Sequence, residues 1–69
     1  MKVDARGLSC PQPVLLAMQA MADAGSGIVE VLVDTEASRE NVMRAAQSKG
    51  WQARATDLPE GGFRLELSR

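Results

Sequence analysis

Residues 6–15 read Arg6-Gly7-Leu8-Ser9-Cys10-Pro11-Gln12-Pro13-Val14-Leu15 and contain the single cysteine of the chain. They lie where a short strand over residues 2–5 should give way to a helix running from Pro11 to about Ala24. Because a residue before proline is pushed toward extended dihedrals, Cys10 suits the N-cap position. Pro11 then suits the first helical position, where a missing N–H costs nothing. The stretch therefore predicts a strand, a loop and a helix with the cysteine at the helix N-terminus.

A thiol at a helix N-terminus is placed to react. The positive end of the helix dipole favours the thiolate. Because Pro11 and Pro13 have no N–H, the backbone N–H groups of Gln12 and of the next residues remain to meet it. Arg6 adds a second positive influence, and Gly7 loosens the turn between them. The alternative is that Cys10 is a small buried hydrophobe that caps a helix. We favour the reactive thiol because cysteine is a poor structural N-cap.

Composition excludes several classes of protein. A chain of 69 residues with 45% apolar and 25% charged residues predicts one folded domain over residues 1–69. Eight basic against nine acidic residues give a net charge of −1, without the basic excess of a nucleic-acid-binding protein. The longest apolar run, 14–18, is too short to span a bilayer, and the N-terminus resembles a strand more than a signal sequence. We therefore expect a cytoplasmic protein that binds neither nucleic acid nor membranes.

The rare residue types narrow the chemistry further. One cysteine allows no internal disulfide, no dithiol pair and no cysteine-built zinc site, so we expect neither a metal nor another cofactor. With no histidine, the chain also lacks a Cys–His or Ser–His pair of nucleophile and base. Moving a sulfur atom onto and off a thiolate suits these restrictions better than hydrolysis does.

Hydrophobic periodicity predicts two helices separated by a buried strand. On the first helix the predicted apolar face consists of Val14, Leu15, Met18, Met21 and Ala22. Gly25-Ser26-Gly27 should end that helix, and the β-branched run Ile28–Val33 reads as a central strand interrupted only by Glu30. Thr35 should cap the second helix, with Ser38 as the competing cap, and Gly50 should end it.

The remainder reads as two strands and a turn. Residues 51–56 form the third strand, and Trp51 should cover one end of the core. Leu58-Pro59-Glu60-Gly61-Gly62 forms a turn, after which Phe63, Leu65 and Leu67 alternate with polar residues in a fourth strand. On the second helix we expect Arg39, Glu40 and Arg44 to form a solvated face.

The element order βαβαββ predicts an α/β (α+β) two-layer sandwich, with a four-stranded mixed sheet and two helices on one face. In such a fold, Cys10 after the first strand and Asp34 after the second should share one edge of the sheet. Asn41 could reach that edge from the second helix, although a locally bonded or exposed Asn is an equal alternative. The sheet face away from the helices is either solvated or used for dimerisation.

Asp4-Ala5-Arg6-Gly7-Leu8-Ser9-Cys10-Pro11-Gln12-Pro13 resembles the signature of the TusA/SirA family of sulfur-carrier proteins, whose mark is Cys-Pro-x-Pro. The likeness covers the whole chain, including the element order and the aspartate after the second strand. Within that family, the run from Val33 to Val42 is similar to the amino-terminal domain of YedF-like proteins, which are associated with selenium metabolism.

The resemblance implies that Cys10 accepts a persulfide sulfur from a protein donor, such as a cysteine desulfurase or a rhodanese-like protein, and relays it to an acceptor protein. It further implies that Pro11 and Pro13 shape the helix start. Asp34 matches the family's acidic position, and because a carboxylate opposes thiolate formation we expect it to order the loop or contact a partner. Such a protein is a sulfurtransferase-like carrier rather than a stand-alone enzyme. Selenium delivery and a non-catalytic regulatory or interaction module are the alternatives.

Overall fold

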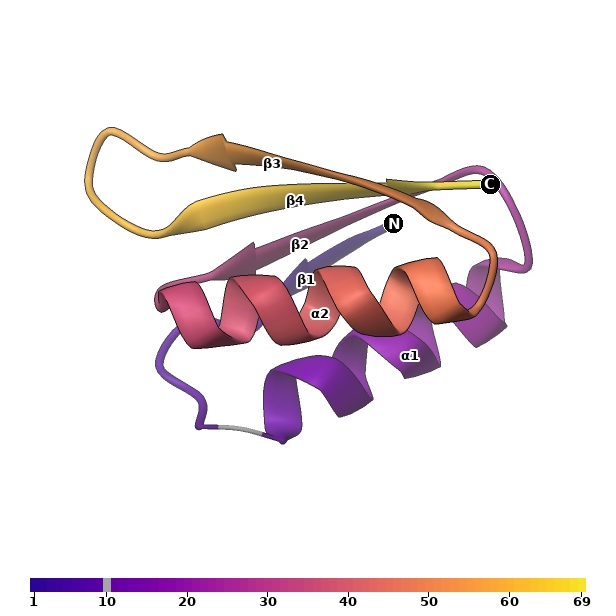
Figure 1. Ribbon diagram of the computed structural model, residues 1–69, viewed down its shortest axis with the longest axis horizontal. Coiled ribbons are helices and arrows are strands. Elements are labelled where there is room, and N and C mark those ends of the chain that lie inside the picture. Colours follow the sequence, from indigo (N-terminus) through magenta and orange to yellow (C-terminus); the bar gives the residue numbers. More distant parts are fainter. Residues whose placement is uncertain (10) are drawn as a thin grey trace.

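The structure is a computed structural model that describes residues 1–9 and 11–69. Figure 1 shows one sheet with both helices on the same side of it. The elements follow the predicted order βαβαββ: β1 (Lys2–Asp4), α1 (Gln12–Ala24), β2 (Ile28–Val33), α2 (Glu36–Ser48), β3 (Gln52–Asp57) and β4 (Phe63–Ser68). The predicted two-layer α+β fold is confirmed.

The sheet has the strand order β1-β2-β4-β3. β1 and β2 are parallel, whereas β4 is antiparallel to both β2 and β3, so the sheet is mixed as predicted. β2 lies inside the sheet, and its side chains Val29, Val31 and Val33 are fully buried. They meet Leu65 and Leu67 of β4, also fully buried, and together these five form the centre of the core beneath the helices.

The boundaries of three elements differ from prediction by one residue, and β3 is shifted by one residue at both ends. β1 ends at Asp4, although the Ala5 N–H still donates to the Leu32 carbonyl at 2.8 Å. α1 begins at Gln12 rather than Pro11. β3 begins at Gln52 because the Trp51 N–H donates to the Ala46 carbonyl at 3.0 Å, which ties it to the end of α2. Trp51 is buried in the core, as expected for a residue that covers one end.

The apolar face predicted for α1 is partly wrong. Met21 is buried, but Leu15 is 58% exposed and Ala22 is exposed as well. The buried face consists instead of Pro13, Ala17, Ala20 and Met21. α1 contacts α2 as well as β1 and β2, and a row of small residues allows such close approach on two sides. The rotation of α1 therefore leaves large apolar side chains facing outward.

The second helix begins as predicted. Thr35 is its N-cap, with extended dihedrals, and its side-chain oxygen accepts the backbone N–H of Ser38 at 3.1 Å. The Thr35 hydroxyl also donates to the Ser38 hydroxyl at 2.9 Å, and Ser38 is buried. Thr35 is thus the N-cap, and Ser38, the alternative candidate, supplies the backbone N–H that Thr35 caps.

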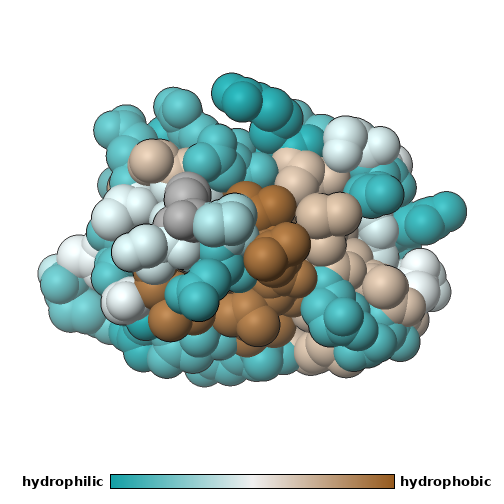
Figure 2. Space-filling model, turned by 90° about the horizontal axis from the view of Figure 1, so that it is seen from below, coloured by the Kyte–Doolittle hydropathy of each residue, from teal (hydrophilic) through white to brown (hydrophobic). Residues whose placement is uncertain are grey.

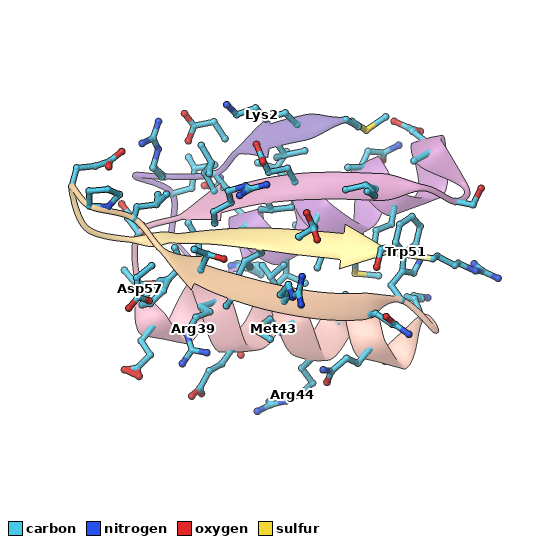
Figure 3. The ribbon with its side chains drawn as sticks, turned by 90° about the horizontal axis from the view of Figure 1, so that it is seen from above. Lys2, Arg39, Met43, Arg44, Trp51 and Asp57 are labelled. Carbon is cyan, nitrogen blue, oxygen red and sulfur yellow. The ribbon has the colours of Figure 1, made fainter. Side chains whose placement is uncertain are left out.

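The sheet face away from the helices carries a stripe of paired charges, visible from above in Figure 3. Glu30 on β2 lies between Lys2 of β1, at 3.8 Å, and Arg64 of β4, with which it forms a direct ion pair. Arg64 also reaches Glu66 at 3.7 Å, and Glu66 lies opposite Arg54 of β3 in the register. Glu30 and Glu66, which lie opposite each other in the register, are thus flanked by the basic residues Lys2, Arg64 and Arg54.

Candidate functional site

The candidate site lies at the end of the sheet where β1 and β2 finish and α2 begins (Figure 1). The loop from β1 to α1 runs along this end and includes Cys10, which lies outside the described residues. The residues on either side of it, Ser9 and Pro11, are exposed. The expectation of an exposed, activated thiol at Cys10 therefore stays a prediction.

Asp34, directly after β2, anchors this loop. Its carboxylate accepts the backbone N–H of Gly7 at 2.7 Å, across 27 residues of sequence. A second, longer bond at 3.4 Å from the Leu8 N–H to the Ala5 carbonyl closes the turn. The carboxyl ends of the two parallel strands thus meet as the fold predicts, and Asp34 makes the loop-ordering contact expected of it.

Arg6 is held by carboxylates beside the loop. Its guanidinium forms a two-bonded contact with Asp4, at 3.0 Å from Nε to Oδ1 and 2.9 Å from Nη2 to Oδ2, and lies 3.7 Å from Glu60. Hydrogen bonds from the side chain and then the backbone of Arg6 lower the pKa of Asp4 to about 2. The same side-chain bond raises the pKa of Arg6. Two carboxylates therefore take up the charge that Arg6 was expected to direct at the thiol.

The start of α1 also differs from prediction. The N-cap is Pro11, with φ −96° and ψ 13°, rather than Cys10. The Gln12 N–H donates to the Ser9 carbonyl at 2.9 Å. The expectation that N–H groups of this turn meet the thiol stays a prediction, because Cys10 lies outside the described residues. The Leu15 N–H donates to the Pro11 carbonyl at 3.0 Å, and Pro13 is buried in the first turn. The helix thus begins one residue later than predicted, at Gln12, with Pro11 outside helical dihedrals.

Comparisons with known proteins agree with this arrangement. The sequence profile of the family described as sulfurtransferase TusA matches residues 1–69. The chain belongs to the TusA family. It is 30% identical over 69 residues to a Methanocaldococcus jannaschii protein provisionally named a sulfur carrier, covering 99% of this chain and 92% of the relative. The crystal structure of a SirA-like protein from Desulfitobacterium hafniense superimposes with a TM-score of 0.92 at 35% identity, covering 99% of this chain and 96% of that one. The TusA/SirA resemblance is confirmed, whereas the YedF-like detail stays a prediction.

The turn between β3 and β4 reaches this end of the TusA-family domain as well. Gly62 packs so closely on β2 that a Cβ there would lie 2.7 Å from the Val33 carbonyl oxygen and 3.2 Å from the Asp34 Cα. Since Glu60 of the same turn faces Arg6, the turn touches both β2 and the β1–α1 loop. Sequence reasoning identified this segment as a turn but gave it no place at the site.

Two residues of α2 lie near the same end. Asn41 is half-buried and has an interaction partner, and its proposed reach toward Cys10 is not among the described contacts. Arg39 was expected on a solvated face, but its side chain is only 25% exposed and stacks over the Phe63 ring at 5.2 Å. That prediction is wrong because Phe63, from β4, offers an aromatic face that the sequence of α2 alone does not reveal.

Sequence reasoning missed a shallow apolar pocket beside the loop. It has a volume of about 280 Å³ and is lined by Leu8, Gln12, Leu15 and Leu16. Figure 2 shows an apolar area on this helical side of the molecule, bordered by hydrophilic residues. The adjacent pair Leu15-Leu16, next to an alanine-lined face, is the signal that could have revealed it.

Among residues 1–9 and 11–69, no three His, Cys, Asp or Glu side chains are grouped so that they could hold a metal ion. In the same part of the chain, neither helix has the length and apolar character needed to cross a membrane.

Proposed function

We propose that this TusA-family protein is a sulfur carrier that holds a sulfur atom as a persulfide on Cys10. The donor is a protein persulfide, as on a cysteine desulfurase or a rhodanese-like protein, and the acceptor is another protein. Residues 1–69 form the single TusA-like domain that does this, in the cytoplasm and without contact to nucleic acid or membrane.

The transfer is an exchange reaction that needs no external oxidant. The Cys10 thiolate attacks the terminal sulfur of the donor persulfide, forming a new S–S bond as the donor's own S–S bond breaks. The donor cysteine leaves as a thiolate and takes up the proton that Cys10 has lost. Cys10 then carries the sulfane sulfur until an acceptor thiolate attacks it in the same way. Donor and acceptor each come to the same loop.

One observation supports this proposal most directly. The loop that contains the only cysteine is tied by the Gly7 N–H to the Asp34 carboxylate at 2.7 Å, and its residues Ser9 and Pro11 are exposed. A fixed and accessible loop suits a group that must meet two different proteins. In this proposal Asp34 orders the loop, while Pro11, Gln12 and Pro13 shape the helix start.

Sulfur loading tests the proposal directly. The purified protein is incubated with a cysteine desulfurase and cysteine, and its intact mass is measured without reducing agent. We expect a gain of one sulfur atom, reversed by dithiothreitol, and no gain in the Cys10→Ser variant. A serine variant that still gains sulfur would refute Cys10 as the carrier.

The pH dependence of alkylation separates a carrier from an interaction module with a structural cysteine. A carrier thiol should react with iodoacetamide at neutral pH faster than an unperturbed thiol of pKa about 8.5. Alkylation with the rate and pH profile of a free cysteine would favour the non-catalytic module.

A further inference from the structure

The apolar pocket beside the β1–α1 loop is lined by large apolar side chains that are exposed to solvent. Leu15 and Leu16 are 58% and 39% exposed, and Leu8 is half-buried next to them. Leu8 belongs to the same loop as Gly7, which is bound to Asp34, so the pocket adjoins the candidate site. An exposed apolar patch at a functional loop is typical of a surface that contacts another protein.

Charge is distributed unevenly along the molecule. The end that carries the loop, called here the acidic end, holds six of the nine acidic residues and only three of the eight basic ones, a formal charge of −3. The remainder holds five basic and three acidic residues, a formal charge of +2, which together give the net charge of −1. The residues of the acidic end are Asp4, Asp34, Glu36, Glu40, Asp57 and Glu60, all exposed, with Arg6, Arg39 and Arg64.

No basic residue of the acidic end is available to a visiting protein. Arg6 is bound to Asp4 and faces Glu60, and Arg39 stacks on Phe63 within 3.5 Å of Glu36 and 3.8 Å of Glu40. Arg64 forms an ion pair with Glu30 and lies 3.7 Å from Glu66. All three therefore neutralise their own neighbours. The unpaired charge that a partner meets at this end is negative.

The size of a protein contact links the pocket to the acidic end. A specific interface covers about 800 Å² of each partner, which is roughly a fifth of the 4082 Å² surface of this protein. Three leucines supply only the centre of such an area. The rest of the contact must spread over neighbouring residues, and the loop leads from Leu8 directly to Asp4, Asp34 and Glu60.

A second copy of the chain does not fit this surface. Two acidic ends would repel each other, which disfavours a symmetric dimer. The acidic end of one copy could approach the basic end of another only head to tail, and such contacts form open chains rather than closed pairs. The complementary occupant is a different protein.

We propose that the pocket and the acidic end form one docking surface for a protein that presents an apolar side chain ringed by lysine and arginine. This inference rests on the proposed function, since the sulfur donor or acceptor would be that protein. The leucines hold the contact, and the opposite charges speed the encounter and exclude acidic proteins. Because both exchanges use the same loop, donor and acceptor would share this basic surface.

Matched peptides test the docking surface without knowledge of the natural partner. Three short helical peptides of equal length are compared. The first has a leucine face surrounded by lysines, the second has the same leucine face surrounded by glutamates, and the third has a serine face surrounded by lysines. Binding to the ¹⁵N-labelled protein is followed by amide shifts in NMR spectra. The lysine–leucine peptide should bind about tenfold or more tightly than either other peptide and should shift the amide signals of residues 6–9, 12 and 14–16. Raising the salt concentration should weaken it.

Variants identify the contact. Leu15→Ser with Leu16→Ser should reduce binding of the lysine–leucine peptide about tenfold. Ile28→Ser is the matched control, since Ile28 is 59% exposed at the opposite end of the molecule, and it should leave binding unchanged. Thermal unfolding followed by circular dichroism should show that all variants stay folded, because each replaced side chain is exposed.

Three results with peptide would overturn the proposal: equal binding of the glutamate–leucine peptide, amide shifts confined to other surfaces, or binding unaffected by the two leucine substitutions. Amide shifts of the leucine patch that depend on protein concentration, without peptide, would identify a second copy as the occupant and overturn it as well. Cys10→Ser should bind the lysine–leucine peptide normally. If the protein binds the lysine–leucine peptide but never loads sulfur, the proposed function is refuted and the docking surface is supported. If it loads sulfur but binds all three peptides equally, the docking surface is refuted and the proposed function is supported.

Discussion

The carboxylate of Asp34 and the backbone N–H of Gly7 lie 2.7 Å apart although 27 residues separate them in the chain. The bond joins the loop after β1 to the residue that ends β2, so it fixes the segment containing the only cysteine against the central strand of the sheet. A carboxylate close to a thiol would by itself oppose ionisation. Its contact with Gly7 supports the alternative expectation, that the Asp34 carboxylate orders the loop.

Replacing Asp34 by alanine should loosen the β1–α1 loop while leaving the sheet intact. The Gly7 amide loses its acceptor and should exchange its hydrogen about three- to tenfold faster, the effect of one charge-assisted bond weakened by solvent. Asp34→Asn, which keeps an acceptor oxygen, should show a smaller change. Hydrogen exchange followed by NMR measures both, and unchanged exchange at Gly7 in the alanine variant would show that the loop is held by other contacts.

Asp4 should titrate well below an ordinary aspartate. Hydrogen bonds from Arg6 lower its pKa from 3.8 to about 2. Because the unfolded chain binds the proton first, the stability contributed by Asp4 is complete above pH 3.8 and is lost as the pH falls toward 2. In Arg6→Gln the pKa should rise part of the way to 3.8, since the backbone N–H at position 6 remains.

Carboxyl chemical shifts followed against pH measure this change. Lys2→Gln is the control, because Lys2 makes the smallest contribution to the shift and its removal should leave the Asp4 midpoint nearly unchanged. A midpoint in Arg6→Gln equal to that of the parent protein would contradict the Asp4–Arg6 contact.

Gly62→Ala should destabilise the protein more than Gly61→Ala. Both glycines have positive φ, at 86° and 100°, which costs an alanine about 1–2 kcal/mol. Only at Gly62 would the new Cβ also meet the Val33 carbonyl oxygen, at 2.7 Å, whereas space is open at Gly61. Urea unfolding of the two variants isolates the clash as their difference. Equal midpoints would show that the β3–β4 turn can move away from β2.

Thr35→Ala should cost about 1 kcal/mol of unfolding free energy, because the Ser38 N–H loses its capping oxygen. Thr35→Ser keeps that oxygen and should cost much less. Urea unfolding with an unchanged slope measures both. An alanine variant as stable as the serine variant would show that water replaces the cap.

Features set by local chemistry could be predicted from the sequence. Thr35 caps α2 because its side-chain oxygen reaches an N–H three residues on. The run Ile28–Val33 forms a central strand because its β-branched residues favour extended backbone and its valines supply a buried face. The meeting of Asp34 with the β1–α1 loop followed from the direction of parallel strands alone. These inferences did not require knowledge of the tertiary contacts between the helices and the sheet.

Features set by tertiary packing could not be predicted. Which face of α1 is buried depends on contacts with α2 and the sheet together, and the alanines at 17 and 20 took the place that Leu15 was expected to fill. Arg39 left the solvated face because a ring 24 residues later lies beneath it. The engagement of Arg6 by Asp4 and Glu60 likewise needed the position of the β3–β4 turn. For Cys10 itself, the sequence and the family remain the basis of the hypothesis.

The charges of both signs on Lys2, Glu30, Arg64, Glu66 and Arg54 bear on whether the uncovered side of the sheet can contact a second copy. A sheet with helices on only one side could otherwise pair with a second copy of the protein through its uncovered face. Such pairing would strip water from charges of both signs, and this desolvation cost opposes it. Neutral substitutions along this row are therefore the mutations that we expect to favour self-association.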